Sequence, residues 1–127
     1  MKKINMVDLN GQYRKIKWQI NREIKKVIKS TSFINGPVVK EFQNNLQNYL
    51  NVRHVIPCAN GTDALQIALM ALDLKKGDEV ITTNFSFAST IEVILLLGLK
   101  PVIVDIDPRT FNIDPSLIES KITKKTK

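Results

Sequence analysis

Residues 54–105 read HVIPCANGTDALQIALMALDLKKGDEVITTNFSFASTIEVILLLGLKPVIVD, and the hydrophobic pattern of this stretch decides the fold. Short extended runs predict three strands, at residues 54–58, 79–83 and 101–105. The intervening residues 61–72 and 87–97 are apolar on nearly every face, which predicts two buried helices. Strands that alternate with helices are typical of a mainly parallel sheet. We therefore predict a three-layer α/β fold, with a parallel sheet between helices.

The residues before this stretch predict two further helices. Between Gln12 and Lys29, apolar residues recur every three or four positions and form one stripe. The stripe consists of Tyr13, Ile16, Ile20, Ile24, Val27 and Ile28. Trp18 lies just off the stripe, and we expect it to be partly packed. The second helix begins at Pro37, which suits a first helical position, and ends near Asn51.

These patterns predict two parts of the chain. Residues 1–51 are expected to form a helical segment that packs outside the sheet. Residues 52–127 are expected to begin an α/β domain. Three strands make a thin sheet for such hydrophobic helices, so we expect further chain beyond residue 127 to complete the layer.

Composition excludes several classes of protein. With 127 residues and 43% hydrophobic content, the chain can bury a moderate core. The net charge of +7 would be compatible with binding to nucleic acid. The lysines are spread over helix surfaces without interleaved aromatic residues, however, so no nucleic-acid partner is predicted. The longest apolar run, Val93–Leu97, is far shorter than a membrane span, and no secretion signal is evident. The single cysteine fits a reducing compartment, and we expect a cytoplasmic protein.

The segment Asn60-Gly61-Thr62 is the strongest candidate for a ligand site. It lies between a predicted strand and a predicted helix, where the free N–H groups of the helix attract anions. Gly61 would let the backbone approach a phosphate, and Thr62 would add a hydroxyl. The alternative is a plain helix cap, in which Asn60 and Thr62 only satisfy backbone donors.

A second candidate segment, residues 82–90, follows the next predicted strand at the same rim of the sheet. Phe87 lies at the mouth of the following helix, where an aromatic ring could stack on a flat cofactor. The alternative is that Phe87 belongs to the core.

Other conspicuous residues favour structural roles. His54 has no partner at ligand spacing, and Cys58 is expected to be a small core residue. Asp105 and Asp107 precede Pro108 and are expected to cap turns. No metal site is predicted. Downstream, Asp114 and Pro115 are typical of a helix start, with the aspartate as the cap.

Several blocks together carry a family resemblance. In chain order they are Val7-Asp8-Leu9, Gln12-Tyr13, Phe33-Ile34-Asn35-Gly36-Pro37, Asn60-Gly61-Thr62-Asp63-Ala64-Leu65, Gly77-Asp78-Glu79-Val80-Ile81, Phe87, Gly98-Leu99-Lys100-Pro101-Val102, Val104-Asp105-Ile106-Asp107 and Asn112-Ile113-Asp114-Pro115. In this order and spacing the chain resembles the DegT/DnrJ/EryC1/StrS family of sugar aminotransferases, which depend on pyridoxal 5'-phosphate (PLP). The resemblance implies part of the large domain of the type I aminotransferase fold.

The resemblance also implies a site. In such a protein Gly61 and Thr62 would hold the PLP phosphate, with Asn60 beside them where many relatives have serine. Phe87 would lie against the pyridine ring. Asn35 and Gly36 match a segment that borders the sugar-binding cleft. The implied reaction transfers an amino group from glutamate to a nucleotide-linked keto-sugar, with the carbonyl at the 3-position, for polysaccharide biosynthesis by a homodimer.

The residues that perform the chemistry in such enzymes have no counterpart here. They are a lysine that forms the Schiff base with PLP and an aspartate that pairs with the pyridine nitrogen. No lysine of this chain lies in a matching context, so no catalytic residue is predicted and the isolated chain is expected to be inactive. The alternative function is a non-catalytic remnant, or a binding and regulatory module that keeps the fold.

Overall fold

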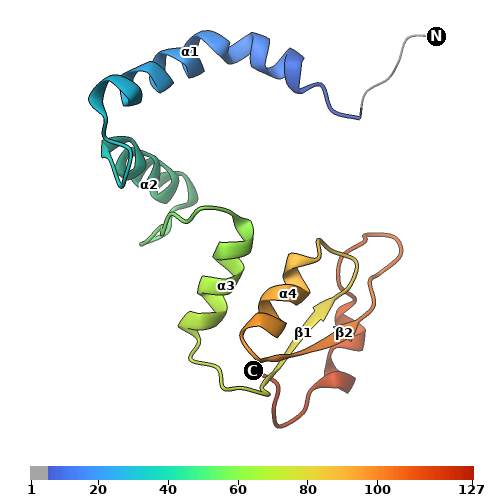
Figure 1. Ribbon diagram of the computed structural model, residues 1–127. Coiled ribbons are helices and arrows are strands. Elements are labelled where there is room, and N and C mark those ends of the chain that lie inside the picture. Colours follow the sequence, from blue (N-terminus) through green and yellow to red (C-terminus); the bar gives the residue numbers. More distant parts are fainter. Residues whose placement is uncertain (1–5) are drawn as a thin grey trace, which may run out of the picture. The chain divides into compact units, whose positions relative to one another are not determined.

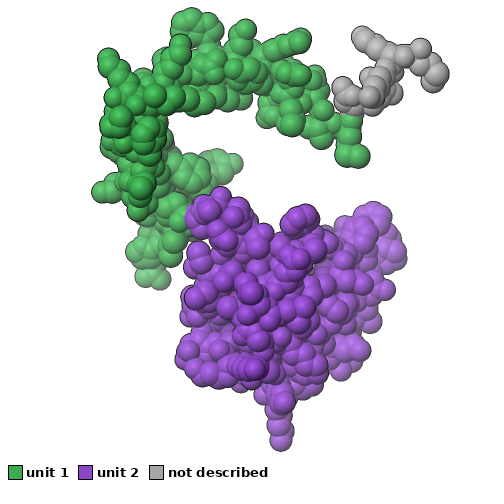
Figure 2. Space-filling view, viewed as in Figure 1, with its two compact units in different colours: residues 1–57 green, residues 58–127 purple. Residues whose placement is uncertain are grey.

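The computed structural model describes residues 6–127, which divide into two compact units. The first unit ends at Pro57, and the second comprises Cys58–Lys127. Figure 2 colours them separately. Across the described residues, none of the helices has the length and apolar character that crossing a membrane requires.

The first unit contains the two predicted helices, α1 (Leu9–Ser30) and α2 (Pro37–Leu50). Helix α1 begins where the Asp8 carboxylate accepts a hydrogen bond from the Gly11 N–H (2.9 Å). Helix α2 begins with Pro37 at its first position, as predicted, and ends at Asn51 in the left-handed conformation (φ 52°).

Neither of these two helices buries a residue completely. The apolar stripe of α1 remains largely accessible; Ile24, for example, is 51% exposed. The expectation that Trp18 is partly packed is wrong, because its side chain is 80% exposed. Trp18 lies one helical turn from both Arg14 and Arg22, which places it on the charged face of the helix. Packing of residues 1–51 on an α/β domain stays a prediction.

The second unit contains the sheet and its helices (Figure 1). Strands β1 (Glu79–Thr83) and β2 (Lys100–Val104) are parallel, with Glu79 opposite Lys100 and Thr83 opposite Val104. Helices α3 (Gly61–Ala71) and α4 (Ser89–Leu96) precede the two strands. Two 3₁₀ helices follow, η1 (Pro115–Leu117) and η2 (Glu119–Lys121), and Asp114 caps the first of them as predicted.

The core of this unit forms around α4. Its buried residues are Val93, Ile94 and Leu99, and the partly buried Leu69, Leu74, Val80 and Leu97 pack against them. Complete burial of a valine, isoleucine or leucine side chain contributes about 1.5–3 kcal/mol to folding, and partial burial contributes less. The chain leaves α4 through Gly98 (φ 72°), a conformation that a residue with a β-carbon rarely adopts. This core sets α4 against both strands and α3 against α4.

The prediction of a first strand at residues 54–58 is wrong. This segment is irregular, and in the described part of the chain its backbone makes no hydrogen bond to another backbone group. A strand exists only through hydrogen bonds to a neighbour, and β1 and β2 pair with each other. Consequently the sheet has two strands in residues 6–127, and the expected three-layer arrangement is reduced to these strands with α4 against them.

Glu79 connects three segments at the start of β1. Its buried carboxylate accepts hydrogen bonds from the Thr123 hydroxyl (2.6 Å) and from the Lys100 ammonium group (2.9 Å). Its backbone N–H donates to the Lys125 carbonyl (2.8 Å), and its carbonyl accepts from the Lys127 N–H (3.1 Å). Two hydrogen bonds lower the pKa of Glu79 below 4.5, because both favour the charged carboxylate. The bond from Thr123 has the larger effect, and the bond from Lys100 the next largest.

This network predicts an acid-dependent loss of stability. A carboxylate whose pKa is lowered by folding stabilises the chain above its unfolded pKa of about 4.5, and this contribution is lost as the pH falls through the folded pKa. We expect Glu79→Gln to destabilise the chain at pH 7, and the difference from the unmodified chain to shrink as the pH falls below 4.5 and through the lowered pKa of Glu79. Urea unfolding followed by circular dichroism at each pH measures it.

The control is Asp73→Asn, which removes an exposed carboxylate that pairs with Lys75 (2.8 Å). An exposed pair of this kind adds little stability, so this variant should resemble the unmodified chain at pH 7. If the Glu79→Gln chain and the unmodified chain lost stability in parallel over the whole pH range, Glu79 would not be the responsible group.

Candidate functional site

The candidate site lies at the edge of the sheet where both strands end. Because β1 and β2 are parallel, Thr83 and Val104 end side by side, and the loops after them begin at the same edge. Helices α3 and α4 run back from this edge, so their amino ends point toward it (Figure 1). In open α/β sheets this is the edge where ligands bind.

Asn60 caps helix α3. Its side-chain oxygen accepts a hydrogen bond from the Asp63 N–H (2.9 Å), and its side-chain NH₂ donates to the Asp63 carboxylate (3.1 Å). The helix-cap interpretation is therefore confirmed for Asn60. Because both polar ends of the side chain are engaged by Asp63, Asn60 fixes the first turn of the helix, including the N–H groups of the next two residues.

Gly61 and Thr62 present free donors at the start of α3. Within the described residues, neither N–H donates to a protein acceptor, and the Thr62 hydroxyl makes no hydrogen bond, unlike the Asn60 side chain. A β-carbon added at Gly61 would meet no atom within 4 Å, and the backbone there does not have a positive φ. Neither crowding nor backbone conformation requires this glycine, so open space lies directly beside two unpaired N–H groups at a positive helix end. This arrangement fits a phosphate group.

Phe87 lies on the loop between β1 and α4, and the interpretation of this residue as core is wrong. Its side chain is 78% exposed. The residue precedes the helix, and its carbonyl accepts a hydrogen bond from the Thr90 N–H (3.1 Å). In the same loop the hydroxyls of Ser86 and Thr90 are 3.1 Å apart and hydrogen-bonded. The ring is thus free to contact a ligand at this edge.

Two further residues of this edge, Phe85 and Phe111, were not singled out from the sequence. Their rings stack with centroids 5.7 Å apart, and an open cavity of about 310 Å³ is lined by Asn84, Phe85 and Ser86. The aromatic residues at alternate positions in Asn84-Phe85-Ser86-Phe87 were the available signal for Phe85. No local pattern relates Phe85 to Phe111, which lies on a different loop.

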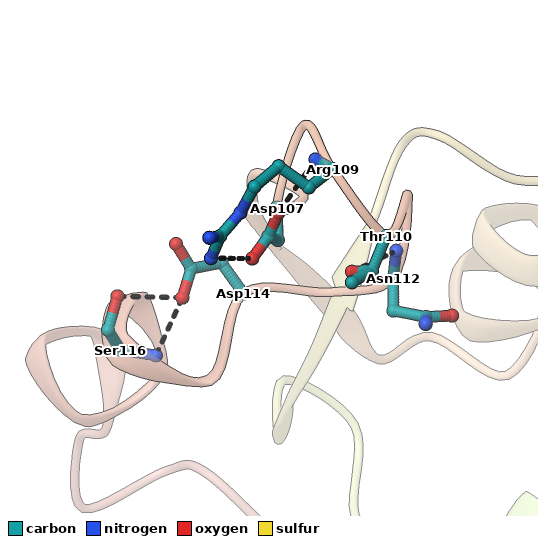
Figure 3. A network of polar contacts seen from close by, with 6 residues as sticks. All are labelled: Asp107, Arg109, Thr110, Asn112, Asp114 and Ser116. Carbon is teal, nitrogen blue, oxygen red and sulfur yellow. Dashed lines mark hydrogen bonds and ion pairs between the residues drawn. The ribbon is translucent and has the colours of Figure 1, made fainter.

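The loop after β2 is organised by aspartates, as predicted (Figure 3). The Asp105 carboxylate accepts a hydrogen bond from the Ile106 N–H (2.8 Å). The Asp107 carboxylate accepts from the backbone N–H of Arg109 (2.7 Å) and from its guanidinium group (3.3 Å), and these bonds lower the pKa of Asp107. Asp107 therefore caps the turn at residues 108–110, as predicted, whereas the Asp105 carboxylate bonds only to the residue that follows it, and no turn begins there.

The remaining predicted residues are Cys58, which is bonded to Asn60, and Asn35 and Gly36 in the first unit. Cys58 is exposed, and its thiol donates to the Asn60 carbonyl (3.5 Å), so the expectation of a core residue is wrong; no sheet strand forms there to cover it. Asn35 adopts a left-handed conformation (φ 49°), and a β-carbon on Gly36 would overlap the carbonyl oxygen of Ser32. The turn itself thus requires Gly36, and a role of Asn35 and Gly36 in sugar binding stays a prediction.

Comparison with known proteins gives relatives along almost the whole chain. The sequence model of the DegT/DnrJ/EryC1/StrS aminotransferase family matches residues 14–127. UDP-2-acetamido-2-deoxy-3-oxo-D-glucuronate aminotransferase from Pseudomonas aeruginosa is 48% identical over 124 residues, which are 98% of this chain and 34% of that protein. A "Pleiotropic regulatory protein" from Geobacillus stearothermophilus is 47% identical over 124 residues, covering 98% of this chain and 33% of its own length. The chain spans about a third of the length of these relatives.

A solved structure supports the same relationship. NtdA from Bacillus subtilis, with bound cofactor PMP, superimposes with a TM-score of 0.87 at 38% identity, and the match covers 99% of this chain and 30% of that chain. The predicted fold class is confirmed: the chain has the α/β architecture of PLP-dependent aminotransferases, with a small parallel sheet.

The cap at Asn60 generates a prediction. Asn60→Ala removes the acceptor for the Asp63 N–H and should destabilise the chain by about 1 kcal/mol, whereas Asn60→Ser keeps a capping oxygen and should recover most of this loss. The free energy of unfolding in urea measures both. Equal stabilities of the alanine and serine variants would show that the cap contributes nothing.

Proposed function

This chain belongs to the DegT/DnrJ/EryC1/StrS aminotransferase family, and we propose that the protein containing it is a PLP-dependent aminotransferase acting on a nucleotide-linked keto-sugar. The observation that carries the proposal is that two unpaired N–H groups lie beside an unobstructed glycine at the start of α3, in a chain that matches this family. The amino donor in this proposal is glutamate, and the active form is a cytoplasmic homodimer.

The proposed acceptor is a sugar with a carbonyl at the 3-position. The name of the Pseudomonas aeruginosa relative describes a 3-oxo sugar attached to UDP, and 48% identity supports a substrate of the same kind. An amino sugar formed in this way would serve polysaccharide biosynthesis. The diphosphate of a nucleotide-linked sugar is anionic, which agrees with the net charge of +7 of the chain. This charge does not by itself require an anionic substrate.

The residues of this chain bind and orient the cofactor in the proposed mechanism. The N–H groups of Gly61 and Thr62, with the Thr62 hydroxyl, would donate hydrogen bonds to the PLP phosphate at the positive end of α3, an interaction worth about 0.3–1 kcal/mol for the helix dipole alone. Asn60 holds that first turn in place through Asp63. Phe87 would cover one face of the pyridine ring and exclude water from it. PLP itself supplies the electron sink on which transamination depends.

A regulatory function is the second candidate. One relative at 47% identity bears the name "Pleiotropic regulatory protein", and this name is the observation that favours the second candidate. Titration of the full-length protein with UDP- and dTDP-linked keto-sugars, with turnover measured in the presence of glutamate, separates the two functions. Turnover supports the aminotransferase, whereas absence of both binding and turnover supports the regulatory module.

Thr62 provides a direct test of the phosphate site. In the full-length protein, Thr62→Glu places a negative charge beside the phosphate and should raise the dissociation constant for PLP by about tenfold or more, which corresponds to about 1.4 kcal/mol. Thr62→Gln, similar in size but uncharged, is the control for steric effects and should be affected less. The absorbance of bound PLP during dialysis measures retention. Equal retention by the glutamate variant and the unmodified protein would remove Thr62 from the site.

The lysines of this chain generate a second prediction. Mixed with PLP and reduced with borohydride, the 127-residue chain should give scattered substoichiometric adducts on surface lysines, because none of its lysines occupies the family's catalytic position. Peptide mapping by mass spectrometry measures the distribution. One stoichiometric adduct at a single lysine, together with glutamate-dependent turnover of a keto-sugar nucleotide, would contradict this expectation.

A further inference from the structure

The stacked pair Phe85 and Phe111 joins the two loops at the ligand-binding edge of the sheet. The ring centroids are 5.7 Å apart with an angle of 24° between the planes. Phe85 is 59% exposed and Phe111 60% exposed, so the pair does not belong to the core. An aromatic contact between two exposed loops indicates that one loop positions the other.

The loop that carries Phe111 is held firmly. The Phe111 N–H donates to the Asp107 carbonyl (2.8 Å), and the Asp107 N–H donates to the Asn112 carbonyl (2.9 Å). Ile106 and Ile113 form an antiparallel bridge that closes the loop. The aspartate and arginine contacts in Figure 3 add further restraints. Phe111 thus projects from a small platform attached to the end of β2.

The backbone conformation of Phe111 shows that this platform is specific. Its φ of 59° lies in the left-handed region, which is unfavourable for a residue with a β-carbon and rare for bulky residues. Asparagine or glycine adopts it at lower cost, and yet phenylalanine occupies the position. The surrounding hydrogen bonds hold Phe111 in this strained conformation. A smaller residue would adopt the conformation more easily but would lack the aromatic ring.

The loop that carries Phe85 has fewer restraints. The Phe85 N–H donates to the Thr83 hydroxyl (3.2 Å), and the Ser86 hydroxyl is paired with Thr90. Phe87, two residues beyond Phe85, is 78% exposed, and on its α4 side its carbonyl accepts a hydrogen bond from the Thr90 N–H (3.1 Å). On its other side the loop is anchored at Phe85 by the only aromatic stacking found in residues 6–127, so the position of Phe87 depends on both ends of the loop.

We propose that Phe111 is a positioning residue for the cofactor: by stacking on Phe85 it holds the loop of residues 84–88 so that Phe87 faces the PLP ring. This inference rests on the proposed function. Phe111 acts through Phe85 and does not itself contact the cofactor. An aromatic pair of this kind is worth a factor of about two to ten in an equilibrium constant.

The test uses the full-length protein with Phe111→Leu, which keeps an apolar side chain but removes the ring, and with Phe111→Tyr, which keeps the ring. Without PLP, the leucine variant should show faster amide hydrogen exchange in residues 84–88, and with PLP it should release the cofactor about two- to tenfold faster, with a changed circular dichroism band of the bound cofactor. The tyrosine variant should restore all three. Phe85→Leu removes the other ring and should reproduce the leucine effect.

Tyr49→Leu is the matched control, because Tyr49 lies on α2 with 85% exposure and stacks on no ring. Unchanged exchange in residues 84–88 of the Phe111→Leu protein would overturn the proposal, and so would faster exchange with an unchanged rate of PLP release. Equal effects of Tyr49→Leu would overturn it as well. An unmodified protein that holds no PLP would refute the proposed function, while the exchange measured without cofactor would still decide whether Phe111 holds the loop.

Discussion

The parallel pairing of β1 with β2 is the constraint on which the candidate site depends. Pairing of Thr83 with Val104 brings two loops to one edge, although the loops begin about twenty residues apart in sequence. Parallel strands need a crossover, and α4 provides it while burying Val93 and Ile94 against the sheet. If that crossover were displaced, Phe85 and Phe111 would separate and the aromatic part of the site would be lost.

The proposed phosphate site depends on the start of α3 and not on strand pairing. A helix end leaves N–H groups without partners, and Asn60 satisfies only one of them, that of Asp63. The donors of Gly61 and Thr62 are left over by the geometry of the helix itself. The observed cap and the proposed anion site use different N–H groups of the same helix start, so one does not exclude the other.

The two ends of β1 have unlike roles. At its start, the buried Glu79 connects β2 and the segment around Thr123 through charge-assisted hydrogen bonds, so this end is held by polar contacts within the unit. At its other end, exposed aromatic side chains occupy the loop that connects β1 to α4. The polar contacts that stabilise the unit therefore lie at the start of β1, where no ligand is expected. The accessible side chains lie at its other end, where a ligand is expected. Such a division is common where a stable sheet carries a functional loop.

The sequence alone determined the features that depend on neighbouring residues. The boundaries of β1, the start of α3 at its asparagine cap, the glycine that ends α4, and the turn capped by Asp107 all follow from local hydrogen bonding and backbone preference. Tertiary structure decided what depends on distant partners. Residues 54–58 are not a strand because no neighbour pairs with them, and Phe87 is exposed because nothing in its unit covers it. Phe85 meets Phe111, and Glu79 meets Thr123, only after the chain has crossed over, since local patterns encode the preference of a residue but not the identity of the residue it will touch.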